Sequence, residues 1–205
     1  MATHKKKKQS KKNIGMAGLF ALLSLTFAGQ SLTTADKVKE CHGVERWDVK
    51  TLQDAAAGEV DYDHIISSSI ANLGNLPLTF NPNRDTEFYR HSPEKKVYLI
   101  KNCKIDLVKN ESSADGDYHL VLKQGNQTMI AEMPDYHCEN NRHSPAIEIF
   151  KKVRTDFQPL LTGKHYRDHT YDITGVAFFD PPHGQKGRNE KNGIELHPIL
   201  DIKIH

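Results

Sequence analysis

The order of the hydrophobic patterns after residue 95 constrains the fold of this chain more than any other feature. Five segments alternate apolar and polar side chains, which is the period-2 pattern of half-buried strands. They cover residues 96–108, 118–122, 129–133, 171–179 and 194–204. A tight reversal at 124–126 joins the second and third segments, so we expect the first three to form consecutive antiparallel strands.

One segment between the third and fourth strands has helical periodicity instead. Ser144 suits an N-cap, Pro145 suits the first helical position, and Gly163 is a typical terminator. The residues that recur on one face are Ala146, Ile149, Phe150, Val153, Phe157, Leu160 and Leu161. The sequence therefore predicts an amphipathic helix over about 145–161.

The predicted order of elements is strand-strand-strand-helix-strand-strand. This is the chain order of an OB-fold, a small five-stranded barrel with a helix between strands 3 and 4. We therefore expect a mainly β protein whose residues 96–205 form an OB-fold-like, five-stranded antiparallel barrel with one amphipathic helix.

The first 28 residues have the three-part layout of a secretory signal peptide. Six lysines between Lys5 and Lys12 precede an apolar run at 14–28, which ends in small residues that suit a signal peptidase. The run is shorter than the roughly 20 residues that a helix needs to span a bilayer. We expect export to the periplasm or the medium, with cleavage after Ala28 and no transmembrane span in the mature chain; an uncleaved membrane anchor is the alternative.

Cleavage would change the net charge of the chain from +2 to −4, because it removes six lysines and no acids. A mildly acidic protein lacks the overall cationic charge that drives phosphate binding. Binding to nucleic acid or to an anionic membrane would then need a local basic patch.

Residues 29–95 carry weaker patterns. A short strand could form at 46–51 and a helical turn at 69–73, while Asn81-Pro82 and Ser92-Pro93 are loop signals. The few apolar residues here could hardly build a core of their own. We expect an N-terminal extension that wraps the barrel and shields an edge.

The three cysteines allow at most one intramolecular disulfide, from three possible pairs. Cys103 falls inside the alternating strand 96–108, where a small buried thiol fits well. Cys41 and Cys138 lie in irregular segments. We favour a Cys41–Cys138 bridge with Cys103 buried and reduced, and the other pairings stay open.

Several short motifs in the chain are distinctive in combination. They are 45–51 (ERWDVKT), 115–122 (DGDYHLVL), 128–132 (TMIAE), 183–185 (HGQ) and 192–198 (NGIELHP). Together they resemble an uncharacterised family of bacterial exported proteins with an OB-fold-like domain, over nearly all of the mature chain. The resemblance implies a fold and a compartment, and it carries over no activity and no catalytic residues.

Twelve histidines in an exported protein raise the hypothesis of a zinc or copper site. His165 and His169 stand four residues apart, and His137, Cys138 and His143 form a second group. Neither group has an established ligand spacing. We interpret these residues as solvated surface side chains.

His183, Glu195 and His197 are expected to lie near one another, because His183 belongs to the loop that enters the last strand. A carboxylate beside two imidazoles could bind zinc or serve a metal-assisted or acid-base hydrolase. Strict alternation puts Glu195 and His197 opposite the apolar side chains, Leu200 included. The alternative is that both are ordinary polar residues on the outer face and that His183 fixes its own loop.

A binding function has more support from the predicted fold. OB-folds bind oligonucleotides or oligosaccharides on strands 2 and 3 and in two loops, here 109–116 and 180–192. The second loop carries the donors His183, Gln185, Lys186, Arg188 and Lys191. We therefore predict a non-enzymatic module for an oligosaccharide, a peptide or an oligonucleotide, with a structural envelope protein as a third possibility.

Two absences weigh against nucleic-acid chemistry. Aromatic residues that could stack on bases are sparse on the predicted strands. No arginine occurs between Lys96 and Tyr136, whereas a thermonuclease-like enzyme needs arginines to stabilise charge on the reacting phosphate.

Overall fold

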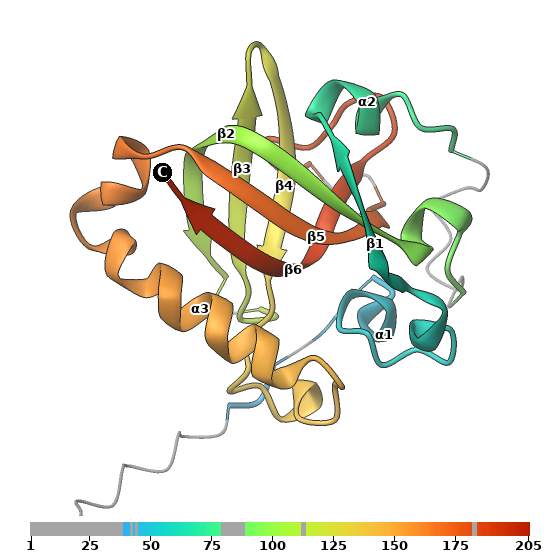
Figure 1. Ribbon diagram of the computed structural model, residues 1–205. Helices are drawn as coiled ribbons and strands as arrows, with labels where there is room; N and C mark the ends of the chain where they lie inside the picture. Colours follow the sequence, from blue (N-terminus) through green and yellow to red (C-terminus); the bar gives the residue numbers. More distant parts are fainter. Residues whose placement is uncertain (1–38, 42, 44, 79–88, 112–113, 182–183) are drawn as a thin grey trace, which may run out of the picture. The chain divides into compact units, whose positions relative to one another are not determined.

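The computed structural model describes residues 39–41, 43, 45–78, 89–111, 114–181 and 184–205 (Figure 1). The expected signal peptide, 1–28, lies outside these residues. The strands are β1 (Asp61–Ser68), β2 (Lys96–Asn110), β3 (Tyr118–Gln124), β4 (Gln127–Met133), β5 (Tyr171–Phe179) and β6 (Ile194–Ile204). The helices are α1 (Trp47–Lys50), α2 (Ile70–Gly74) and α3 (Ile147–Leu161), with 3-10 turns η1 (Ala57–Glu59), η2 (Ser92–Lys95), η3 (Glu139–Asn141) and η4 (Thr162–Asp168). Among the described residues, none of these helices is long and apolar enough to cross a membrane.

Five strands close into a barrel in the order β2-β3-β4-β6-β5, with β5 pairing back to β2. The expected five-stranded barrel with one helix between its third and fourth strands is confirmed. The expectation that all strands are antiparallel is wrong, because β4 and β6 run parallel. The reason is topological: an odd number of strands cannot close a ring in which every neighbour is antiparallel.

The long strand β2 pairs with two strands of the barrel, β5 and β3, along different halves of its length. Its first half pairs with β5 and its second half with β3, and the register shifts between Ile100 and Cys103. Asn102 lies at this shift with a φ of 55°, in the left-handed region. Asparagine tolerates that region better than most residues do. The shift lets one strand close the barrel.

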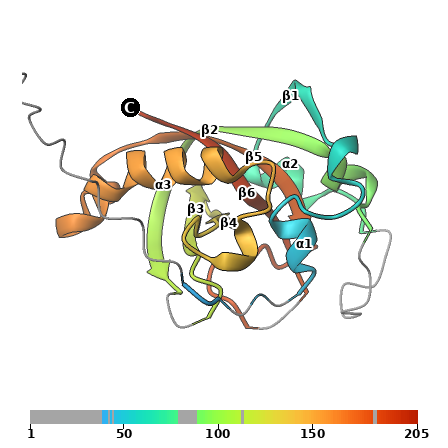
Figure 2. The ribbon, with the colours of Figure 1, turned by 90° about the horizontal axis from the view of Figure 1, so that it is seen from below.

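Helix α3 packs across one end of the barrel, as Figure 2 shows from below. Val153 and Phe157 are buried in the main core. The helix begins two residues later than expected, because Ser144 accepts a hydrogen bond from the Ala146 amide and closes a turn before it. Gly163, with a φ of 65°, breaks the helix, and the chain continues as η4.

Strand β6 departs from strict alternation near its middle. The register with β5 shifts between Gly175 and Ala177, so β6 holds an extra residue there. As a result Ile199 packs in the main core and Leu200 packs against a separate apolar cluster outside the barrel. The expectation that Leu200 shares a face with Ile194 is therefore wrong.

The part of the N-terminal region that the structure describes lies against the outer wall of the barrel. The short strand considered for 46–51 is wrong: this stretch forms α1, and 49–52 are all buried, which an alternating strand on a surface could not achieve. The turn expected at 69–73 is confirmed as α2, with Ser69 as its N-cap. The outer apolar cluster contains Leu52, Val60, Val97, Ala146, Phe150 and Val176.

Buried ion pairs join parts of this segment to one another, and β-pairing attaches it to the barrel. Arg46 donates to both carboxylate oxygens of Glu94, at 2.6 and 2.8 Å. Arg90 donates in the same two-point way to Asp54. Strand β1 adds a parallel pairing to β2. Two-point arginine–carboxylate pairs fix orientation as well as distance.

The disulfide prediction is confirmed. Cys41 and Cys138 are bonded, with their Cα atoms 5.5 Å apart. Cys103 is a free, buried thiol, and its burial raises its pKa to about 12. The bridge ties the start of the described chain to the segment that precedes α3.

Candidate functional site

The outer wall of the barrel carries ionisable side chains that are removed from solvent. Inward residues of β3, β4 and β6, such as Leu120, Ala131 and Leu196, fill the main core. The side chains between them point outward, where α1 and the β5–β6 loop cover them. We call this set the buried charged cluster: Lys50, Asp117, His119, Glu132, Asp180, Glu195 and His197, none of them more than 4% exposed.

His197 lies at the centre of the cluster. Its Nε2 is 3.2 Å from Oδ2 of Asp117, and its Nδ1 is 3.1 Å from Oε2 of Glu132 and 3.3 Å from Oε1 of Glu195. The edge of the Phe178 ring closes another side, with ring centroids 5.9 Å apart. Burial alone would lower the pKa of His197, but the three carboxylates raise it well above 6.5.

His119 fixes the orientation of Glu132. Its Nδ1 is 2.7 Å from Oε1 of Glu132, and its Nε2 is 3.2 Å from the backbone carbonyl oxygen of Lys186. Both partners accept hydrogen bonds, so both ring nitrogens are placed to carry protons. Burial opposes that charge, yet Glu132 raises the pKa of His119.

Lys50 supplies the cluster's ammonium group. Its Nζ is 3.5 Å from a Glu45 oxygen and 3.7 Å from Oδ1 of Asp180. Burial alone would lower the pKa of Lys50, but the charges of Glu132, Asp180 and Glu195 raise it above its usual value. Helix α1 therefore delivers one fixed positive charge to a group of carboxylates.

The carboxyl groups of the cluster differ in their affinity for protons. Burial raises the pKa of Asp117 to about 6, and burial together with Glu195 raises the pKa of Asp180 to about 8. Burial would also raise the pKa of Glu132, but His119 and His197 hold it well below its usual range. Such a network can store and exchange protons, which is the property that acid-base chemistry needs.

The cluster also has the donor atoms of a metal site. Asp117, Glu132 and His197 each offer one donor atom within 4.8 Å of the other two. Three buried atoms in the cluster, Asp117 Oδ2, Glu195 Oε2 and His197 Nε2, have no hydrogen-bond partner of good geometry. Buried polar atoms normally have one, so each of these calls for an explanation.

The structure brings together only part of the trio chosen from the sequence. Glu195 and His197 meet, while His183 lies outside the described residues. Glu195 and His197 lie on the outer wall of the barrel, as expected if they were ordinary polar residues. They are, however, buried and not solvated. Sequence reasoning missed Asp117 and Glu132; the available signal was a polar residue directly before β3 and another at an outward position of β4.

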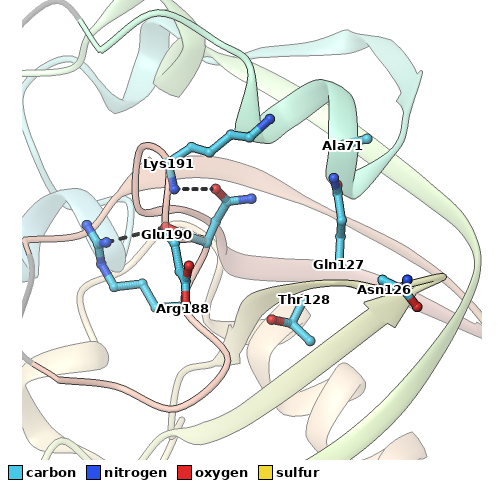
Figure 3. Close-up of a pocket in the computed structure, with 9 residues that line it drawn as sticks. Ala71, Asn126, Gln127, Thr128, Arg188, Glu190 and Lys191 are labelled. Carbon is cyan, nitrogen blue, oxygen red and sulfur yellow. Dashed lines mark hydrogen bonds between the residues drawn. The ribbon is translucent and has the colours of Figure 1, made fainter.

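The β5–β6 loop forms a second feature, a polar hollow of about 270 Å³ (Figure 3). Asn126, Gln127 and Thr128 of the β3–β4 hairpin face Arg188 and the residues that follow it across the hollow. Its lining is Ala71, Gly74, Asn126, Gln127, Thr128, Arg188, Asn189, Glu190 and Lys191. We call it the hairpin hollow.

Contacts within the fold give the loop a defined shape. The Asn192 side chain donates to the carbonyl oxygens of Leu73 and Leu76 next to α2. Gly187 has a φ of 87°, and a Cβ there would lie 2.5 Å from a methyl group of Val121 on β3. Only glycine lets the loop lie this close to the strand.

The five predicted ligand contacts of this loop separate in space. Arg188 and Lys191 line the hairpin hollow, and Lys186 lines a different one beside Arg167. Arg188 donates to the Asp180 and Asn189 carbonyl oxygens, but its buried Nε has no partner, and neither has Oε1 of Gln185. The fifth contact, His183, is not among the described residues.

The other histidine groups do not converge on a site. His165 is exposed and lies 3.2 Å from Asp168, while Nδ1 of His169 approaches the carbonyl oxygen of His205. In the second group, Cys138 is in the disulfide and His137 bonds Asp135. Of the residues that the structure describes, only Asp117, Glu132 and His197 form a three-member set with metal-ligand spacing.

Comparisons with known protein families, with curated proteins and with solved structures find no match for this chain. The resemblance to a family of exported proteins therefore stays a prediction, and functional conclusions depend on the geometry alone.

Proposed function

We propose that this protein is an exported, OB-fold-like binding module that takes a polar ligand in the hairpin hollow. Strands β2 to β6 follow the OB-fold chain order, with α3 between the third and fourth strands of the barrel. In that fold, ligands contact the second and third strands and the loop between the fourth and fifth. Here these elements are β3, β4 and the β5–β6 loop.

One observation carries the proposal: the β5–β6 loop and the β3–β4 hairpin jointly line a hollow. It therefore lies between two of the elements that OB-folds use for ligands. The loop is anchored to α2 through Asn192, so it would lose little freedom when a ligand binds.

The lining favours an oligosaccharide as the ligand. The hollow offers amide groups from Asn126 and Gln127, a hydroxyl group from Thr128, and the cations Arg188 and Lys191. These groups suit the many hydroxyl groups of a sugar chain. No aromatic side chain is among the lining residues, whereas binding of single-stranded nucleic acid normally uses stacking on aromatic rings.

Export is part of the same proposal. The lysine-rich start and the short apolar run support it, and the Cys41–Cys138 disulfide is typical of oxidising compartments. Mass spectrometry of the protein from its native host should find a mature chain that begins near Gly29. An intact N-terminus on protein recovered from the cytosol would contradict export.

Titration of the labelled protein with chitotetraose, maltotetraose and a ten-nucleotide thymidine strand tests the ligand class. We expect NMR shift changes at 126–128 and 188–191 with a sugar, and weakened binding in Lys191→Ala. Lys186→Ala is the matched control, because it removes a lysine from the same loop but from the other hollow. Equal loss in both variants, or tighter binding of the DNA strand than of either sugar, would contradict the proposal.

A metal-assisted or acid-base hydrolase is the second candidate. The observation in its favour is the contact of His197 with Glu195, Glu132 and Asp117. We rank it second because each of these four residues is at most 3% exposed, so a substrate has no open path to them in this structure. Hydrolysis of a glycan by the wild-type protein that is lost in Glu195→Gln would reverse this order.

A further inference from the structure

The buried charged cluster has a feature that the hairpin hollow does not explain. Nε2 of His197 and Oδ2 of Asp117 face each other at 3.2 Å, and neither has a hydrogen-bond partner of good geometry. Both residues are at least 99% buried. The two atoms form a buried ion pair without hydrogen-bond geometry, and an ion between them would complete the coordination of both.

The spacing of these two atoms fits a shared metal ion. Oxygen and imidazole ligands lie about 2.0–2.2 Å from zinc, so two ligands at tetrahedral or octahedral angles are roughly 3 Å apart. The 3.2 Å between Nε2 and Oδ2 has that value. Glu132 offers a third donor atom, within 4.8 Å of a ring nitrogen of His197 and of a carboxylate oxygen of Asp117.

The surroundings hold these donors as the outer shell of a metal site would. Nδ1 of His197 is 3.3 Å from Oε1 of Glu195, so Nδ1 can donate its proton to that carboxylate and leave Nε2 as the ligand. His119 contacts Glu132 at 2.7 Å and the Lys186 carbonyl oxygen at 3.2 Å. Partners of this kind fix the orientation of ligating side chains.

The charge of the cluster also calls for a cation. Asp117, Glu132, Asp180 and Glu195 are four buried carboxyl groups, and the one lysine among them is Lys50. Buried carboxylates persist when they are paired or when they coordinate a metal. When Nε2 of His197 is a metal ligand the imidazole is neutral, so a divalent ion brings two positive charges to the carboxylates in place of the one on the imidazolium.

We propose that Asp117, Glu132 and His197 form a binding site for a divalent transition metal, with Glu195 and His119 as positioning residues. One imidazole with two carboxylates suits zinc, manganese or iron, while calcium and magnesium prefer oxygen ligands alone. This site is separate from the hairpin hollow, so the proposal stands or fails independently of sugar binding.

Metal analysis of untagged protein tests the proposal. The exported chain is produced in separate media supplemented with zinc, manganese, iron or cobalt, and is purified in a buffer that contains a chelator. Production in the cell lets the metal enter during folding, which matters because the site is closed. We expect about one ion per chain for at least one metal. Less than about a tenth of an ion per chain with all four would overturn the proposal.

Two isosteric variants locate the site. Asp117→Asn and His197→Gln each remove a ligand, and we expect the metal content to fall at least tenfold, since loss of even an outer-shell partner costs about 10–100-fold in affinity. His165→Gln is the matched control, because His165 also lies 3.2 Å from an aspartate but is exposed. Unchanged metal content in both cluster variants would overturn the assignment.

A measurement on the wild-type protein covers the case in which the variants do not fold. X-ray absorption at the edge of the bound metal reports its ligands directly. Nitrogen and oxygen ligands that include one imidazole are the expected result. Sulfur ligands, or oxygen ligands without an imidazole, would overturn the assignment.

Discussion

Replacing Lys50 with Met tests whether the buried charged cluster is electrostatically coupled. Methionine has nearly the length of lysine and is apolar, so the change removes the ammonium and keeps most of the packing. Lys50 is 2% exposed and lies 3.7 Å from Asp180. Removing one partner of a buried ion pair leaves the other charge uncompensated, which costs about 3–5 kcal/mol. Better burial of the methionine offsets part of this, and we expect a loss of about 3 kcal/mol.

Urea unfolding with the disulfide intact measures this loss as a shift of the midpoint at constant slope. Lys152→Met is the control, because Lys152 also pairs with an aspartate, Asp156 at 2.7 Å, but on the exposed face of α3. We expect no measurable change there. The double variant Lys50→Met, Asp180→Asn should lose less stability than the sum of the two single variants, by at least about 1 kcal/mol, because the two side chains interact. A Lys50→Met protein as stable as wild type, or a double variant with purely additive losses, would refute this reasoning.

Three further predictions concern the core and the cysteines. Phe157→Ala should destabilise the protein by about 3–5 kcal/mol in urea, because Phe157 is fully buried against the barrel core; a loss below about 1 kcal/mol would show that α3 is not packed as described. Replacing Cys41 and Cys138 together with Ser should cost about 2–5 kcal/mol, since the bridge closes a loop over a sequence separation of 97 residues; unchanged stability would contradict a constraining bridge. Burial raises the pKa of Cys103 to about 12, so this thiol should resist alkylation at pH 8 in the folded protein. A non-reducing thiol count after unfolding should find one reactive thiol per chain. Two or three reactive thiols would mean that the bridge does not form.

Hydrophobic periodicity predicted the barrel strands and α3 because burial on one face of an element leaves a regular pattern. The pattern failed where the backbone is irregular. In β6, the extra residue opposite Gly175 moves Ile199 into the core, and alternation has no means to show such a shift. The segment that contains Lys50 had no clear period, because it is a single helical turn covered on several sides.

The candidate site was harder to predict for a different reason. Glu132 and Glu195 occupy outward positions of β4 and β6, where polar residues are expected on any barrel, and Asp117 directly precedes β3. Their burial depends on α1 and the β5–β6 loop, which are distant in the chain, so no local pattern reports it. Sequence reasoning could therefore single out Glu195 and His197 by residue type but could not find the carboxylates that face His197.

Anomalous X-ray diffraction from a crystal of the untagged protein tests the central claim, the metal assignment, most directly. Data recorded above and below the absorption edge of the bound metal locate the ion without reference to any substitution. We expect one strong peak about 2.0–2.2 Å from Nε2 of His197 and from a carboxylate oxygen of Asp117. No peak, with Nε2 of His197 hydrogen-bonded directly to Asp117, would contradict the assignment and identify the cluster as a proton-sharing network.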